Sequence, residues 1–140
     1  MPLLKFIRAQ DKCWQRVCCE LQAGKKQSHW IWYVFPQIIG LGHSENAEHY
    51  GIESVQQAQD YLKIPKLKLR LIAATKCILQ HKEKTLTEIM GRPDDLKFIS
   101  SMTLFHLISE EDIFKQALDT FNNGEYCQKT IHFINQDSNL

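Results

Sequence analysis

Two polar clusters along the chain combine residue types that recognise small anionic molecules. The first cluster lies in residues 26–37 and consists of Lys26, Ser28, His29, Trp30, Trp32 and Gln37. Lysine attracts phosphate, an indole ring offers a flat stacking surface, and histidine titrates near neutral pH, so this set suits a nucleotide or another planar anion. The alternative is structural, with the tryptophans in the core and the serine capping a helix.

The second cluster surrounds the start of a predicted helix and consists of Arg92, Asp94, Asp95, Lys97, Ser100 and Ser101. The free amides and partial positive charge of a helix N-terminus can hold a phosphate. An aspartate at that position more commonly caps the helix, and Asp94 or Asp95 could do so here. Lys97 and Ser101 are four residues apart, so they share a helical face and could both reach one ligand.

The elements that carry these clusters are predicted to be helices. Apolar residues from Leu3 to Leu21 fall near helical spacing, and Gly24 follows where a left-handed cap would lie. Residues 54–57 and 85–88 are typical capping boxes, in which the first and last side chains satisfy each other's backbone amides.

Three further segments have helical patterns, namely residues 67–78, residues 96–103 and a stretch from Ser109 to about Gly124. We therefore predict an all-α fold, a compact single domain over residues 1–140 with about six helices. The polar C-terminal tail, about residues 131–140, is expected to fray.

Local sequence patterns do not decide the secondary structure of the run from His29 to Phe35. Its aromatic and β-branched residues favour a strand, and local propensity leans slightly that way. Ser28 could instead cap a short buried helix that stops before Pro36. Short dense apolar runs are ambiguous by periodicity, so both alternatives stay open on local grounds.

Composition narrows the class of protein. A chain of 140 residues with 44% hydrophobic and 24% charged residues is typical of one globular domain. With a net charge of +1, a nucleic-acid partner is not expected. No stretch is apolar enough to span a bilayer, and the charged start does not form a signal-peptide core, so we expect a cytoplasmic protein without a membrane partner.

Neither a metal nor a cofactor is expected. The five cysteines lack Cys-x-x-Cys spacing, which indicates reduced, buried thiols rather than a disulfide framework or a zinc site: Cys13, Cys18, Cys19, Cys77 and Cys127. His43 and His49 are six residues apart, which is no recognised metal-ligand spacing. No phosphate-binding or dinucleotide-binding loop is present.

Residues 24–37, GKKQSHWIWYVFPQ, followed by residues 40–44, GLGHS, resemble the signature of a bacterial domain-of-unknown-function family. Its pattern is K-x-S-H-W-x-W-x-x-F-P-Q, and its members are often mislabelled calpastatin. Further similarity lies in residues 58–65 and 93–105, so the resemblance extends from about Leu4 to Thr130. It implies an all-helical fold, which outweighs the local preference of residues 29–35 for a strand.

Two positions depart from the family pattern. Ile64 stands where a histidine is common, and Ile99 where an arginine is common, so no role of those side chains is carried over. The calpastatin label implies nothing for this chain, because true calpastatins are disordered inhibitors and this composition is globular.

Three hypotheses about function remain at this level. The first is a protein that binds a small anionic or nucleotide-like ligand in a pocket formed by Lys26, Ser28, His29, Trp30, Trp32, Gln37, Lys97 and Ser101. It requires the two clusters to converge in the fold. The second is an N-glycosidic hydrolase acting on ADP-ribose-type substrates. The third is a non-catalytic protein-interaction domain, which would expose a large apolar patch.

The hydrolase hypothesis rests on a faint similarity to helical domains named for NAD and ADP-ribose processing, carried by Tyr50, Ser54, Lys97 and Met102. Such chemistry requires a carboxylate beside the sugar. The candidate catalytic residues are Glu53, Asp94, Asp95 and His29. The sequence does not decide whether the protein is an enzyme or what its oligomeric state is.

Overall fold

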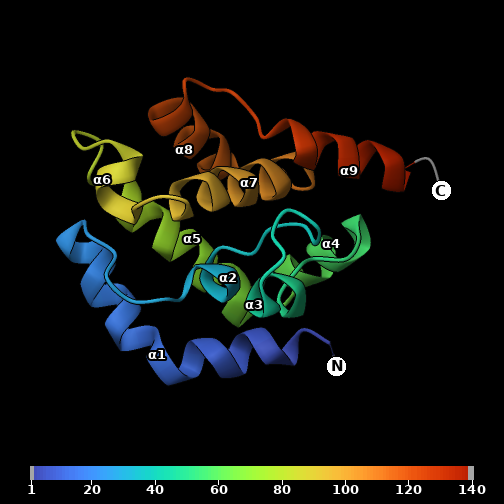
Figure 1. Ribbon diagram of the computed structural model, residues 1–140, viewed down its shortest axis with the longest axis horizontal. Coiled ribbons are helices and arrows are strands. Elements are labelled where there is room, and N and C mark those ends of the chain that lie inside the picture. The colour runs from blue at the N-terminus through green and yellow to red at the C-terminus, as the bar shows by residue number, and fades with distance from the viewer. Residues whose placement is uncertain (1, 139–140) are drawn as a thin grey trace.

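Nine helices, without a strand, make up the part of the chain that the computed structural model describes, residues 2–138 (Figure 1). In chain order they are α1 (Leu4–Ala23), α2 (Ile31–Val34), α3 (Glu45–His49), α4 (Val55–Lys63), α5 (Pro65–Leu79), α6 (Leu86–Met90), α7 (Asp94–Leu107), α8 (Asp112–Asn122) and α9 (Gln128–Ser138). The all-α single domain is confirmed, and the count of about six helices is corrected, because α3 and α9 were not predicted and the short helix α2 was only one of two alternatives for residues 29–35. Two of these span only about one turn, which is too short for a periodicity to show.

Helix α7 is the centre of the core. Nine of its residues between Asp95 and Phe105 are buried, which is typical of a helix that other elements surround on all sides. It packs against α2, α6, α8 and α9, while α5 packs against α1, α4 and α8. The residues of α7 are therefore held by several neighbouring helices at once.

The first helix ends as predicted, at Gly24. This glycine has φ 71°, and its amide donates to the carbonyl oxygen of Leu21 at 3.1 Å. A Cβ atom added there would lie 2.8 Å from Nδ1 of His81. Only glycine tolerates both the left-handed backbone and this close approach, so the chain turns sharply into residues 25–30.

The aromatic run forms the short helix α2 rather than a strand. Its Ile31 and Val34 are each 1% exposed, so burial against neighbouring helices overrides the strand preference of these residues. The extended pairing lies beyond Pro36, where Ile38 and Ile52 form an isolated parallel bridge. The Ile39 amide donates to the Ile52 carbonyl and the Ile52 amide to the Gln37 carbonyl, each at 2.9 Å, which holds Gln37 in place.

The predicted helix caps have mixed outcomes. The capping box of Thr85 and Glu88 is present in both directions. Ser54 accepts the Gln57 amide at 3.0 Å, but the Gln57 side chain accepts from the Glu53 amide instead of the Ser54 amide. The prediction that Asp94 or Asp95 caps α7 is wrong, because the helix already begins at Asp94 and Pro93 precedes it without a side-chain cap.

Helix α9 covers most of the tail for which fraying is predicted. Phe133 and Ile134 pack against the core, and the Asp137 carboxylate accepts the Val55 amide at 2.8 Å. These contacts join the C-terminal segment to the start of α4. The polar composition of that segment did not predict them. Residues 139–140 of the predicted tail lie outside the described residues.

The sequence also led to predictions about membrane-spanning segments and about the cysteines. None of the helices in residues 2–138 is long and apolar enough to cross a membrane. All five cysteines are free thiols, but the prediction that they are buried is wrong, because Cys19 is exposed and the others are half-buried.

Candidate functional site

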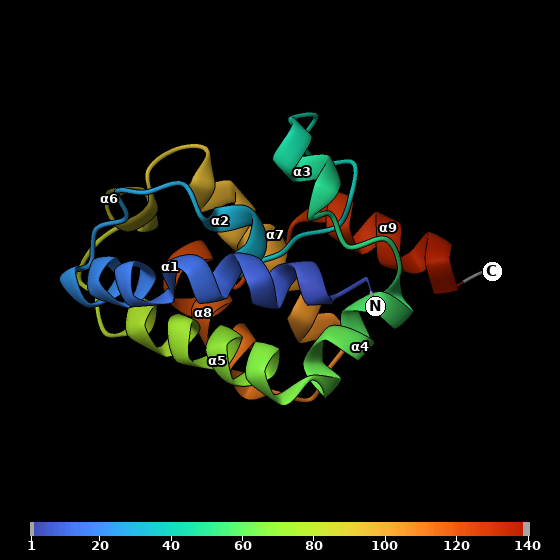
Figure 2. The same cartoon turned by 90° about the horizontal axis from the view of Figure 1, so that it is seen from below.

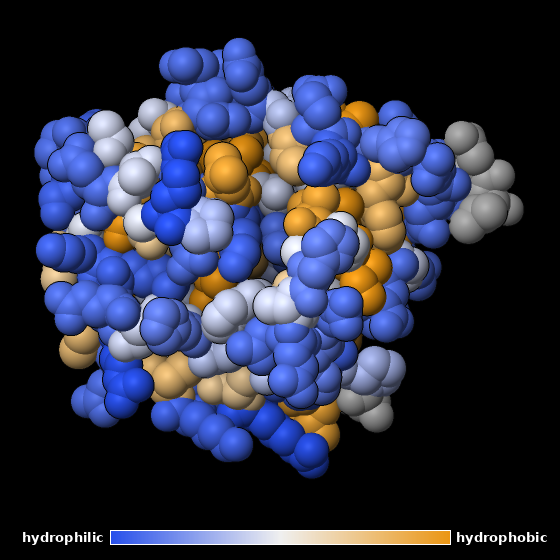
Figure 3. Space-filling model, in the orientation of Figure 1, coloured by the Kyte–Doolittle hydropathy of each residue, from blue (hydrophilic) through white to orange (hydrophobic). Residues whose placement is uncertain are grey.

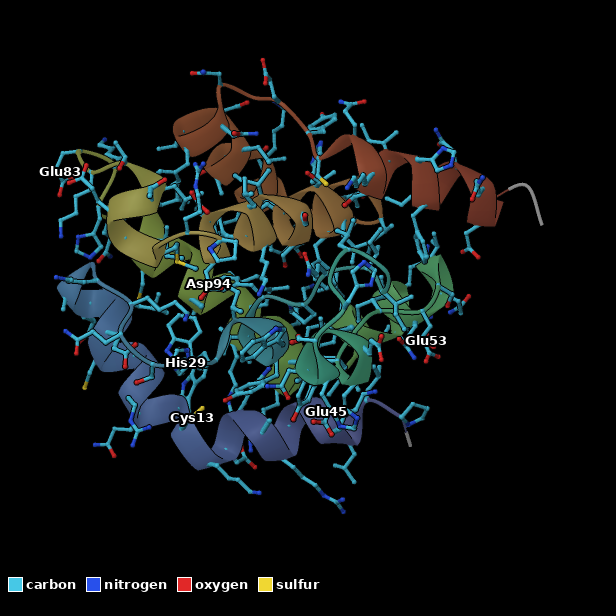
Figure 4. All side chains as sticks on the ribbon, in the orientation of Figure 1. Cys13, His29, Glu45, Glu53, Glu83 and Asp94 are labelled. Carbon is cyan, nitrogen blue, oxygen red and sulfur yellow. The ribbon has the colours of Figure 1, made fainter. Side chains whose placement is uncertain are left out.

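The two polar clusters converge at the start of α7. The Lys26 Nζ atom lies 2.6 Å from Oδ2 of Asp94, and the Lys97 Nζ atom lies 3.6 Å from Oδ1 of the same carboxylate. Lys97 also lies over the Trp32 ring, 5.1 Å from its centroid. Figure 4 shows Asp94 and His29 on facing segments, one at the start of α7 and the other just before α2. Asp94 therefore links residues of the first cluster to residues of the second.

Lys26 belongs to the interior. Its side chain is 4% exposed and donates to the Ser28 carbonyl at 2.5 Å. Its ammonium group lies 4.9 Å from the centroid of the Trp30 ring, and its amide donates to the Ile89 carbonyl at 2.7 Å. A buried ammonium group needs such compensation, and Lys26 receives it from within the fold.

Glu20 organises the same segment, although nothing in the sequence singled it out. Its carboxylate accepts the Gln27 amide at 2.7 Å, the Ser28 amide at 2.9 Å, the Ser28 hydroxyl at 2.6 Å and the Trp30 indole N–H at 3.0 Å. Burial raises the pKa of Glu20, but the hydrogen bonds from Ser28, Gln27 and Trp30 outweigh it and lower the pKa to about 2. Glu20, Lys26, Ser28, Trp30 and Asp94 together form what we call the buried anchor.

Beside the buried anchor lies a cleft of about 660 Å³. Its walls come from the segment that leads into α3, the start of α7, and the loop that leads into α9. The lining residues are Gln37, Leu41, Gly42, His43, Ser44, Ala47, Pro93, Leu96, Lys97, Ile99, Ser100, Asn122, Tyr126, Cys127, Gln128 and Lys129. Figure 3 views the side of the molecule that carries α3, α7 and α9, where hydrophobic residues lie between larger hydrophilic areas.

The charged side chains in the described lining of the cleft are basic. Its described lining includes Lys97, Lys129 and His43 but neither an aspartate nor a glutamate. The nearest acidic contact is Asp94, which touches Lys97 from outside the lining at 3.6 Å. Apolar side chains form much of the remaining wall. The combination of apolar walls with a few cationic and polar groups is typical of small-molecule sites.

Cys127 is a lining residue whose role the sequence did not suggest. Its sulfur accepts the Ser100 hydroxyl at 3.3 Å, and its amide donates to Oγ1 of Thr103 at 3.0 Å. Burial raises the pKa of this thiol, but hydrogen bonds from Ser100 and from the amides at the start of α9 outweigh it and lower the pKa. The thiol is thus half-buried and turned toward the protein's own donors.

Of the proposed ligand-binding residues, only Gln37 and Lys97 line the cleft. Ser28 and Trp30 belong to the buried anchor, and His29 is exposed. Ser101 is fully buried, and its hydroxyl has no partner within the described part of the chain; its neighbour Ser100 lines the cleft instead.

Trp32 is half-buried, and its indole N–H has no hydrogen-bond partner among the described residues. Its ring contributes to the site through Lys97, which it helps to hold at the edge of the cleft.

The candidate catalytic carboxylates are dispersed. Asp95 is 4% exposed and accepts hydrogen bonds from Thr87 at 2.6 Å and Arg92 at 3.3 Å. Glu53 is exposed and is not part of the cleft lining. Among these three carboxylates, Asp94 is the one that contacts a basic residue of the cleft lining, Lys97. Within residues 2–138, no three histidine, cysteine, aspartate or glutamate side chains are grouped so that they could hold a metal ion.

The fold and the cleft define a class of small, single-domain, all-helical proteins with a mixed apolar and cationic cleft beside the central helix. The chain belongs to the family described as protein of unknown function (DUF1810), whose model matches residues 1–134. It is similar to the conserved hypothetical protein Rv1873 from Mycobacterium tuberculosis, whose crystal structure superposes with a TM-score of 0.93 at 40% sequence identity, over 95% of this chain and 96% of that one. The comparison with curated proteins finds no match.

Proposed function

We propose that this protein binds a small anionic, nucleotide-like ligand in the cleft. The observation that carries the proposal is the charge of the lining: Lys97 and Lys129 line a hollow whose described lining contains no carboxylate. An anion entering this hollow meets attraction without a matching repulsion. A volume of about 660 Å³ is within the usual size of small-molecule sites.

Lys97 is the cation best placed to respond to a ligand. Its Nζ atom is held by Asp94 at 3.6 Å, longer than the 2.6 Å between Lys26 and the same carboxylate. Lys26 satisfies Asp94 from the interior, so the ammonium group of Lys97 can turn toward an anion without leaving Asp94 unpaired. Gln37, which the bridge between Ile38 and Ile52 fixes in place, offers amide donors and an acceptor at the same cleft.

The other two hypotheses have less support from the geometry. Hydrolysis of an N-glycosidic bond requires a carboxylate at the sugar, and no described lining residue supplies one. A protein-interaction surface requires a broad apolar patch. The exposed large hydrophobic residues instead lie apart, with Leu69 on α5 and Leu96 and Leu107 at opposite ends of α7.

The test is thermal unfolding of the protein with nucleotides, ADP-ribose, NAD and sugar phosphates. A ligand at a hundred times its dissociation constant stabilises the folded state by about 2.7 kcal/mol, which raises the midpoint measurably. We expect Lys97→Ala to abolish the shift that the best monophosphate ligand, such as a nucleoside monophosphate or a sugar phosphate, produces.

The matched control is Lys82→Ala, which removes the same charge from an exposed position outside the cleft and should leave the shift intact. A panel without any shift, or a shift with a monophosphate ligand that survives Lys97→Ala, would contradict the proposal. Analysis of the same incubations for a released base or sugar separates a binding protein from a hydrolase.

A further inference from the structure

A second hollow lies between α1, the Tyr33 side of α2 and the C-terminal end of α3. It has a volume of about 470 Å³ and is lined by Lys5, Arg8, Ala9, Lys12, Cys13, Tyr33, His49 and Tyr50. We call it the α1 groove. Figure 2 shows α1 crossing the molecule with α3 beside its N-terminal half. The α1 groove and the cleft share no lining residue.

The α1 groove concentrates positive charge. Lys5, Arg8 and Lys12 are three and four residues apart, so they follow one face of α1. Arg8 and Lys12 are exposed, and neither forms an ion pair with a carboxylate in residues 2–138. The described lining contains no aspartate or glutamate.

The acidic residue nearest in sequence does not neutralise these cations. Asp11 lies next to Lys12, but its carboxylate is engaged by α5, with Lys66 at 3.1 Å and Arg70 at 2.8 Å. These ion pairs and hydrogen bonds also lower the pKa of Asp11. Lys66 and Arg70 of α5 thus share a carboxylate partner on α1, whereas Arg8 and Lys12 pair with no carboxylate in residues 2–138.

Tyrosines form the floor of the α1 groove. The rings of Tyr33 and Tyr50 lie 5.2 Å apart, and the His49 ring meets Tyr50 edge-on at 4.6 Å. Burial raises the pKa of both tyrosines, so their hydroxyl groups stay neutral and add no negative charge to the groove. The Lys5 ammonium group donates to the His49 carbonyl at 2.5 Å, which fixes the end of α3 against α1.

We propose that the α1 groove is a binding site for a small molecule that carries two or more linked phosphate groups. Lys5 and Lys12 are seven residues apart, which is about 10 Å along the axis of a helix. A single phosphate does not span that row of cations, whereas linked phosphates can contact successive turns. Arginine and lysine supply charge-assisted hydrogen bonds to such oxygens, and the Tyr50 hydroxyl adds a neutral donor.

The experiment is calorimetric titration of the protein with inorganic triphosphate. We expect the double variant Arg8→Ala/Lys12→Ala to bind at least about tenfold more weakly, since two charge-assisted contacts are removed. The matched control, Lys76→Ala/Lys82→Ala, removes two exposed cations elsewhere and should bind as the unchanged protein does. Lys97→Ala should also leave triphosphate binding intact, which separates this site from the cleft.

Three results would overturn the proposal. The first is no binding of triphosphate by the unchanged protein. The second is an equal loss in both double variants, which would attribute binding to net charge alone. The third is binding confined to single-stranded oligonucleotides or to vesicles of anionic lipid, each titrated in parallel. Lys12→Glu, at an exposed position, provides a second variant and should abolish binding while the unfolding midpoint remains close to that of the unchanged protein.

Discussion

The buried anchor and the cleft lie side by side and contain similar side chains, yet they handle charge in opposite ways. In the buried anchor, Lys26 is 4% exposed and Glu20 is 9% exposed, and each has several partners from the same chain. In the cleft, Lys97 is 22% exposed and its ion pair with Asp94 is long. The comparison shows that a lysine and a tryptophan in a polar motif can stabilise the fold, while a neighbouring lysine stays partly exposed at the cleft.

The physical reason is the cost of isolating a charge from water. A buried carboxylate or ammonium group is tolerated only when hydrogen bonds or an opposite charge replace its hydration. A group that water still reaches does not need such partners. Removal of one member should therefore have large effects on stability in the buried anchor and small effects in the cleft.

The largest effect is expected for Glu20→Ala. The substitution leaves the Gln27 and Ser28 amides, the Ser28 hydroxyl and the Trp30 indole N–H without their acceptor. We expect the free energy of unfolding to fall by about 3 kcal/mol or more. Urea denaturation measures this value, and a loss below about 1 kcal/mol would show that water replaces the carboxylate and that the buried anchor is not buried in solution.

Glu20 also predicts a pH dependence. Its pKa is lowered from 4.5 to about 2, so its contribution to stability is complete above the unfolded value and is lost as the pH falls from 4.5 through 2. The difference in stability between the unchanged protein and Glu20→Gln should be largest near neutral pH and should shrink in that acidic range. A difference that stays constant down to the lower end of the range would contradict the assignment.

A smaller effect, with a defined asymmetry, is expected for the pair of Lys26 and Asp94. Asp94→Asn leaves the buried Lys26 ammonium group without a counter-charge, which should cost about 3 kcal/mol. Lys26→Met should cost less, because Asp94 is 20% exposed and keeps Lys97 as a partner. The double variant measures the coupling; strictly additive losses would show that the two charges do not depend on each other.

The smallest effect is expected in the cleft. Lys97→Ala should change the free energy of unfolding by about 1 kcal/mol at most, since it removes a long, partly exposed ion pair and one contact with the Trp32 ring. His29→Ala, at an exposed position, is the matched comparison and should stay within about 0.5 kcal/mol. A loss at Lys97 as large as that at Asp94 would remove the distinction between the buried anchor and the cleft.

Much of the helical framework was predictable because its signals are local. Gly24 ends α1, and the Thr85 capping box starts α6, through hydrogen bonds that span only a few residues. The apolar periodicities of α1 and α5 belong to single segments in the same way. The elements that were left open or not predicted depend on contacts elsewhere in the chain, such as α2, which burial keeps helical, and α9, which Asp137 joins to α4.

The site was predictable only in part. The two polar clusters were identified from residue types, and their convergence was stated as a condition that the structure meets through Asp94. Residue types did not distinguish Lys26 from Lys97, or Ser101 from Ser100. Glu20 and Cys127 were missed altogether, because a single glutamate near a helix end and a single cysteine without a partner motif carry no local signal.

The sequence by itself determined that the chain folds into one helical domain, where α1 ends and α6 begins, and which segments hold polar and aromatic residues. These properties depend on backbone hydrogen bonds and periodicities within a few turns. The tertiary structure alone decided which of those residues are buried and which line a cleft. The pairing of Lys26 with Asp94, and of Ser100 with Cys127, joins segments that are distant in the chain. Burial and partners are properties of that packing, and they divide similar side chains between the interior of the fold and the lining of the cleft.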